Sequence, residues 1–323
     1  MIIRNSKQQV WQILGGLLLL LFSLCEVACG GRDTGRKVIA VSFESQKWIV
    51  EQIVGDDYEV VALLPPGSDP ELFDPDMRTM RALERAQLYL TTNTLGFETQ
   101  VGERIRANYP DLEVIDISEG IEVLMHTHGV AGASRHGHLH EDRHDEGEDG
   151  HKHGHDSHPV GDPHVLSSLR NVGIVADNVL AAVRQLSPES TARYARNHAL
   201  LEGRLLKMQT TTDSLLTVSG AGGCSFVVMH PSLSYYARDY GMTQIPLEID
   251  GKEATPRQLE ERLHAAEESS PRALFFEEGH SARQAREIAR SLGIEAYPVR
   301  LNGSDFLQGI DNVTRALARQ TEN

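Results

Sequence analysis

The stretch that decides the fold is residues 188–218, PESTARYARNHALLEGRLLKMQTTTDSLLTV. It has no proline after its first residue, and apolar side chains recur along it at helical spacing, at Tyr194, Leu201, Leu205, Met208 and Leu215. Thirty helical residues span about 45 Å, which is too long to cover one small sheet. We therefore expect one long helix joining two lobes, with Ser187 as its N-cap and Pro188 as its first residue.

Strands and helices alternate on both sides of this long helix. Apolar strands precede it in KVIAVSF, YEVVALL, LYLTTN and LEVIDIS, and follow it in CSFVVMH, ALFFEE and EAYPV. Such alternation with helical stretches predicts βα units and parallel strands. The predicted fold class is α/β, with two similar lobes, each a parallel-type sheet flanked by helices, joined by one long helix. Because ligands of such sheets bind beyond the carboxyl ends of the strands, we expect the site in the crevice between the lobes.

The first 28 residues predict an export signal. Arg4 and Lys7 precede an apolar stretch from Val10 to Leu24, which is short for a membrane span and typical of a signal peptide. The following EVACGG resembles the lipobox of bacterial lipoproteins, in which Cys29 becomes acylated, although Glu26 stands where an aliphatic residue is usual. We therefore predict a periplasmic or cell-surface lipoprotein anchored to the membrane. An ordinary cleaved signal or an uncleaved anchor is the alternative.

Composition and chain order set the expected organisation. The chain carries 46 acidic and 31 basic residues and a formal net charge of −15. An acidic surface repels nucleic acid and suits cations, so we expect no nucleic-acid partner. We also expect a monomer. The predicted segments are a signal peptide at 1–28, a lipid-anchored linker at 29–36, an N-terminal lobe at 37–187, a linking helix at 188–217 and a C-terminal lobe at 218–323.

Ten histidines lie between Met125 and Pro159, in MHTHGVAGASRHGHLHEDRHDEGEDGHKHGHDSHP. Almost no apolar residue accompanies them, so residues 126–158 are expected to form a disordered, solvated loop. Imidazole adds affinity for zinc, copper and nickel, which favours weak binding of several ions over a plain linker. The accessory ligands predicted here are His136, His138, His140, His144, His151, His153, His155 and His158, with His126 and His128 also in the loop.

Two further histidines stand at the ends of predicted elements. His230 directly follows the strand CSFVVM, and His164 lies in GDPHVL, where the His-rich loop gives way to a helix. A single histidine in such a place is more often a structural residue than a ligand. Two such histidines, at corresponding positions on the crevice side of the two lobes, indicate a metal site between the lobes.

The motifs PPGSDPELFDP, GDPH followed by a helix, and VVMHPSLSYYARDYG resemble those of the zinc and manganese solute-binding proteins of bacterial ABC importers. The likeness covers about residues 37–320, and a His-rich loop before the second motif resembles the zinc-importing branch. The resemblance implies that each motif offers one residue to the ion. By position, His164 and His230 match the second and third ligands of the family.

The chain departs from the family pattern at two ligand positions. Glu71 stands where most members have histidine, and a carboxylate oxygen binds zinc at a distance similar to that of an imidazole nitrogen. Arg300 stands where the family usually has an acidic residue, and arginine does not ligate metals. Asp305 is the nearest replacement; the alternatives for this fourth ligand are Glu277, Glu248 or water.

The remaining histidines are expected to have other roles. His198 and His264 lie on predicted helices and are expected at the surface, whereas His280 lies near the crevice by topology.

The resulting hypothesis is an extracytoplasmic receptor that captures Zn²⁺, or alternatively Mn²⁺, and delivers it to an ABC transporter permease. One rival is a zinc hydrolase, but the chain lacks H-E-x-x-H or a comparable catalytic motif, so we predict no enzymatic activity. The other rival is a metal buffer or adhesin that uses only the His-rich loop. Deleting residues 126–158 separates these, because only a buffer loses its tight site.

Overall fold

The computed structural model describes residues 36–65, 68, 70, 73–125, 161–248, 254–277 and 281–319. Val38–Asn323 form one compact unit, and Met1–Lys37 form another, of which Arg36 and Lys37 are described. The predicted signal peptide, Cys29 and the His-rich loop lie outside the described residues.

The first lobe is built on a four-stranded sheet in the order β2-β1-β3-β4. Pairing is parallel between β1 and β3 and between β3 and β4, as the alternation of elements predicts. The strands are β1 (Lys37–Val41), β2 (Tyr58–Ala62), β3 (Ala86–Thr91) and β4 (Glu113–Asp116). The helices are α2 (Glu44–Val54), α3 (Met77–Glu84), α4 (Gly96–Asn108) and α5 (Leu169–Leu186), with short 3₁₀ turns η1 (Gly55–Asp57) and η2 (Val165–Ser167).

The second lobe repeats this plan with a parallel sheet in the order β6-β5-β7-β8. Its strands are β5 (Ser225–Val228), β6 (Thr243–Pro246), β7 (Ala273–Glu277) and β8 (Glu295–Val299), and its helices are α7 (Ser234–Asp239), α8 (Pro256–Ser269), α9 (Ala282–Ser291) and α10 (Phe306–Ala318). In each sheet the first strand lies between the second and the third. Ligands of α/β sheets bind at the carboxyl end of the sheet, at such a switch point.

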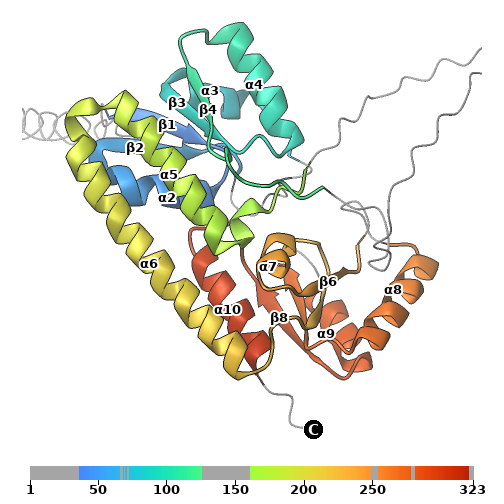
Figure 1. Cartoon of the computed structure of the whole chain (residues 1–323). Helices are drawn as coiled ribbons and strands as arrows, with labels where there is room; N and C mark the ends of the chain where they lie inside the picture. Colours follow the sequence, from blue (N-terminus) through green and yellow to red (C-terminus); the bar gives the residue numbers. More distant parts are fainter. Residues whose placement is uncertain are drawn as a thin grey trace, which may run out of the picture. The chain divides into compact units, whose positions relative to one another are not determined.

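The long helix α6 (Thr191–Val218) joins the two lobes, which confirms the predicted fold class. It packs on α2 and α5 in the first lobe and on α10 in the second, as the yellow helix in Figure 1 shows. Its start differs from the expectation, because Pro188–Ser190 form a separate 3₁₀ turn, η3. The Ser187 hydroxyl does not cap the helix; it is hydrogen-bonded to the Tyr58 hydroxyl at 2.6 Å.

One apolar core runs without interruption through both lobes. It includes buried side chains from β1, α2, α5 and α6 on one side and from β5, α7 and α10 on the other. At the junction the ring of Trp48 in α2 meets Phe306 in α10 edge-on, with centroids 5.6 Å apart, and the Arg204 guanidinium of α6 lies over Trp48. Smaller separate cores lie under α3 and α4 and under α8 and α9. The lobes are therefore fixed to each other by buried contacts as well as by the chain.

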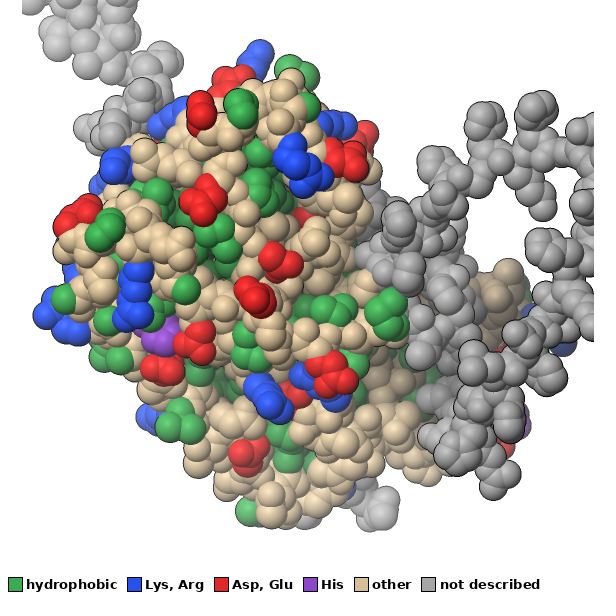
Figure 2. Space-filling view, turned by 45° about the horizontal axis from the view of Figure 1, so that its top comes forward, with side chains coloured by type: hydrophobic (Ala, Val, Ile, Leu, Met, Phe, Trp, Pro, Cys, Tyr) green, Lys and Arg blue, Asp and Glu red, His purple; other side chains and the backbone are tan. Residues whose placement is uncertain are grey.

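Acidic, basic and apolar side chains are interspersed on the face of the molecule seen in Figure 2. Among the helices that the structure describes, none combines the length and the apolar character needed to cross a bilayer.

Gly309 in α10 allows the helix to pack closely against the backbone at Arg300. A Cβ atom there would lie 1.9 Å from the Arg300 carbonyl oxygen, at the start of the loop that continues through Leu301 and Asn302. We expect Gly309→Ala to lower the free energy of unfolding by about 1–3 kcal/mol, because backbone must move to relieve the overlap. Chemical denaturation measures this effect.

Gly203→Ala is the matched control. Gly203 lies in α6, and a Cβ atom added there would meet nothing within 4 Å, so alanine should stabilise the protein by up to about 1 kcal/mol through helix propensity. If both substitutions changed the free energy of unfolding equally, crowding at Gly309 would not be the cause of the change.

Candidate metal centre

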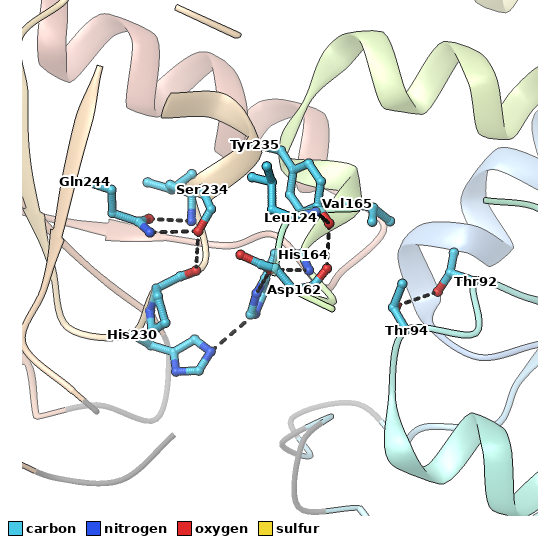
Figure 3. Close-up of polar contacts among 12 residues, drawn as sticks. Thr92, Thr94, Leu124, Asp162, His164, Val165, His230, Ser234, Tyr235 and Gln244 are labelled. Atoms are coloured by element: carbon cyan, nitrogen blue, oxygen red, sulfur yellow. Dashed lines mark hydrogen bonds and ion pairs between the residues drawn. The ribbon is translucent and has the colours of Figure 1, made fainter. Parts of the chain in front are cut away.

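His164 and His230 face each other from the two lobes. His230 lies two residues beyond β5, and His164 directly precedes η2. Their Nε2 atoms are 3.3 Å apart and their ring centroids 5.0 Å apart. Figure 3 marks the contact between the two rings with a dashed line. The structure thus brings together two imidazoles that are 66 residues apart in the sequence.

Each imidazole is held from behind by a carboxylate. His164 Nδ1 lies 2.9 Å from Asp162 Oδ1, and His230 Nδ1 lies 3.1 Å from Glu248 Oε2. A carboxylate at Nδ1 favours the tautomer that carries its hydrogen there, which leaves the Nε2 lone pair for a metal. Two nitrogens bound to one tetrahedral zinc at about 2.05 Å lie about 3.3 Å apart, and the observed separation has this value. The two Nε2 atoms therefore fit one shared cation.

Asp162 fixes His164 through backbone as well as side chain. Its Oδ1 accepts the His164 backbone N–H at 2.9 Å, a local turn typical of Asp followed by proline. The Tyr235 hydroxyl of α7 donates to the Asp162 carbonyl at 2.7 Å and accepts the Leu124 N–H at 3.2 Å. Burial raises the pKa of Tyr235 to about 12, so its hydroxyl stays protonated and can donate. A residue of the second lobe thus positions the His164 turn.

The Asp162 carboxyl remains ionised despite being buried. Burial by itself raises its pKa, but the hydrogen bonds with the side chain and backbone of His164 act in the opposite direction and prevail, so the pKa lies below its usual value. An ionised carboxylate at Nδ1 raises the basicity of the metal-binding nitrogen.

Strand register places Glu248 beside His230. Val228 pairs with Pro246 in the parallel β5–β6 ladder. His230 lies two residues after Val228, and Glu248 lies two residues after Pro246. The Glu248 N–H donates to the Met229 carbonyl at 2.9 Å, which extends the ladder to this point. Glu248 stays one of the alternatives for the fourth ligand, and in this structure its Oε2 contacts His230 Nδ1.

The family model described as zinc-uptake complex component A, periplasmic (ZnuA), matches residues 39–319. The chain belongs to this family. A crystal structure of ZnuA superposes with a TM-score of 0.71 at 25% identity, covering 88% of this chain and 98% of that one.

Two curated relatives are the zinc-binding protein AdcA of Streptococcus pyogenes serotype M3 and the zinc-binding lipoprotein AdcA of Streptococcus pneumoniae strain R6. Each is 25% identical, over 86% and 94% of this chain respectively. The chain spans about half the length of these relatives, 54% and 57%.

In this ZnuA-family chain the first-lobe side of the site is organised by a buried carboxylate, Glu98. It accepts hydrogen bonds from the backbone N–H groups of Thr92 at 3.0 Å, Thr94 at 2.9 Å and Leu95 at 3.2 Å, and from the Ser42 hydroxyl. These donors lie at the carboxyl ends of β1 and β3, the switch point of the first sheet. Glu98 therefore fixes the loops that form this wall.

A cavity of about 20 Å³, enough for one water molecule, adjoins His164. Phe43 and Leu95 line it from the first lobe, and Leu301 and Asn302 line it from the segment after β8. The segment that begins at Arg300 therefore reaches the site.

Some of the other predicted ligands lie outside the described residues, and others lie within them. Glu71, His280 and the histidines of the accessory loop lie outside the described residues. Asp305 is described at the start of α10, half exposed and 3.4 Å from Arg300. Glu277, at the end of β7, has a buried Oε1 atom without a hydrogen-bond partner among the described residues. Assignments to Glu71 and Asp305 stay predictions.

One expectation about the other histidines is wrong. His198 in α6 is buried, with 6% of its surface exposed, because α6 packs against α5 along this side of the first lobe. His264 in α8 is exposed, as expected.

Sequence analysis does not single out Asp162, Glu98 or Tyr235. The Asp-Pro-His order indicates a turn that could have revealed Asp162. Glu98, three residues after the N-cap position, matches a capping-box glutamate. Tyr235 has no such signal.

We expect Glu98→Gln to lower the free energy of unfolding by about 1.5–3 kcal/mol. An amide NH2 group replaces one carboxylate oxygen, and this donor then faces backbone N–H donors that have lost their acceptor. Urea denaturation with an unchanged slope measures this. Glu103→Gln, on the exposed side of the same helix, is the control and should change stability by less than about 0.5 kcal/mol. A loss no larger than that of the control would contradict the role given to Glu98.

Proposed function

We propose that this chain is an extracytoplasmic receptor that captures Zn²⁺ between its two lobes and delivers it to an ABC permease. The observation that carries the proposal is the pair of Nε2 atoms, from His164 and His230, 3.3 Å apart with both Nδ1 atoms at carboxylates. Membership of a zinc-uptake family and the names of the AdcA relatives support the same cargo.

The proposed ligand set draws on both lobes. His164 and Glu71 come from the first lobe, and His230 and one carboxylate come from the second. Asp305 is the carboxylate inferred from position, and Glu277 is its competitor because one of its oxygens is buried without a hydrogen bond to any described residue. Two imidazoles favour zinc, while each carboxylate added to the site moves the preference toward manganese, which remains the alternative cargo.

The contacts between the lobes suit a receptor that moves little. The core passes from one lobe to the other, and α6 is an unbroken helix of 28 residues. We infer that capture tilts the lobes slightly, without a wide hinge opening, and that the permease must act on the protein to release the ion.

Export and anchoring complete the proposal. The sequence of the first 28 residues and the lipobox-like EVACGG support acylation at Cys29, and one relative is named a lipoprotein. We infer a periplasmic or cell-surface protein tethered to the membrane. Because the family is one of zinc uptake, we infer a binding role and no enzymatic activity for this chain.

Zinc titration of the purified protein tests the cargo site. We expect His164→Ala and His230→Ala each to weaken the tightest zinc site by more than the roughly 100-fold reached when a supporting residue is lost. Asp162→Asn should weaken it by about 10- to 100-fold, because the ring loses its ionised partner. Competition with a zinc chelator measures these affinities.

His264→Ala is the matched control, because this histidine is exposed on α8 and should leave the tight site unchanged. If the tightest zinc site survived in both His164→Ala and His230→Ala, the proposal would be wrong.

Removal of the His-rich segment separates a receptor from a buffer. The Asp162 N–H donates to the Leu124 carbonyl at 2.6 Å, and Met125 pairs with Gly161, so both ends of the segment lie side by side. A short Gly–Ser turn can therefore replace residues 126–158. We expect the total zinc bound at saturation to fall, while the affinity of the tightest site changes less than about threefold, since His164 and His230 stay in place. A buffer would lose its tightest site with the segment.

A further inference from the structure

A second group of possible metal ligands lies on the α5–α6 pair. Asp177 belongs to α5, and His198 and Glu202 belong to α6. One ligand atom from each lies within 4.8 Å of the other two, and within the described residues only this group of three or more histidine, cysteine or acidic side chains is so close. His198 and Glu202 are four residues apart and therefore share one helix face.

His198 is the fixed member of this group. Its side chain is 8% exposed, whereas those of Asp177 and Glu202 are 63% and 58% exposed. The imidazole therefore has one orientation, while the two carboxylates can adjust from the solvent side.

The contact between His198 and Asp177 is not an ordinary hydrogen bond. His198 Nε2 lies 2.8 Å from Asp177 Oδ1, yet this buried nitrogen makes no hydrogen bond with any described residue. Glu202 Oε2 lies 3.4 Å from Nδ1, so this exposed carboxylate would turn to reach an ion at Nε2. The oxygen is close enough but lies off the direction of a ring N–H. A buried nitrogen without a hydrogen bond is costly, and a cation held between the nitrogen and the oxygen removes that cost.

We infer that Asp177, His198 and Glu202 form a second divalent-cation site, separate from the site at His164 and His230. Two carboxylates and one neutral imidazole carry two negative charges, which a divalent cation balances. A nitrogen and two oxygens, with water completing the shell, suit zinc, and by the usual order of affinities they bind manganese more weakly. The ion would join α5 to α6 where the long helix lies against the first lobe.

The two sites share no residue and no element that carries a ligand. His164 and His230 lie at the mouths of the sheets, whereas the second site lies along the outer helix pair (Figure 1). The second site therefore does not depend on the proposed receptor function.

Equilibrium dialysis with Zn²⁺ on the full chain tests this inference. The variant is Asp177→Asn with Glu202→Gln, two near-isosteric changes at exposed side chains that leave buried His198 in place. We expect it to bind one zinc equivalent fewer than the parent. Zinc held by the His-rich segment is present in both proteins and cancels in the difference.

Glu267→Gln with Glu268→Gln is the matched control. It removes the same charge beside His264, which has an acidic neighbour at helical spacing but belongs to no group of three among the described residues, and should lose no equivalent. A third protein carries His164→Ala and His230→Ala and should bind one equivalent fewer at the cargo site. When these changes are combined with Asp177→Asn and Glu202→Gln, the two losses should add. A failure of either site is then visible by itself.

Cooperative thermal unfolding establishes that each variant is folded. The inference is overturned if the Asp177→Asn/Glu202→Gln variant binds as many equivalents as the parent. It is equally overturned if the control loses as many, because the effect would then be one of surface charge alone.

Discussion

The rest of the structure depends on the continuous apolar core that joins the two lobes and fixes the position of one sheet relative to the other. Trp48 and Phe306 meet within it, and α6 supplies apolar side chains to both halves. Since this core is buried, a shift of one lobe against the other costs apolar contacts as well as chain entropy. The separation of His164 and His230 is therefore set by the packing of the core that joins the lobes.

At the site itself, the side chains are arranged to favour a positive charge. Asp162 and Glu248 hold the rings from behind, and both Nε2 lone pairs then point toward one place. Two lone pairs at this distance repel each other unless a cation lies between them. The same geometry is a preformed half of a tetrahedral shell, so that little rearrangement is needed on binding. The buried Glu98, with its backbone donors, gives the first-lobe wall comparable rigidity.

Much of this could be predicted from local sequence. The order of strands and helices, the long helix and the places of His164 and His230 follow from apolar periodicity and from residues at the ends of strands. The supporting contacts of Glu248 and Tyr235 could not, because they depend on which segments become neighbours. Glu248 meets His230 through strand register, and Tyr235 reaches Asp162 from another lobe. The burial of His198 could not be predicted either, because helical position alone does not reveal what packs over a residue; α5 decides that.

By itself, the sequence determined the α/β plan, the division into two lobes and the two histidines that face the crevice, because periodicity and strand-end position are local properties. Only the tertiary structure decided how close those histidines come, which carboxylates support them, and that Asp177 joins His198 and Glu202. The Asp162–His164 contact is a local turn, but the other relations join residues distant in the chain, and strand register and helix packing fix them.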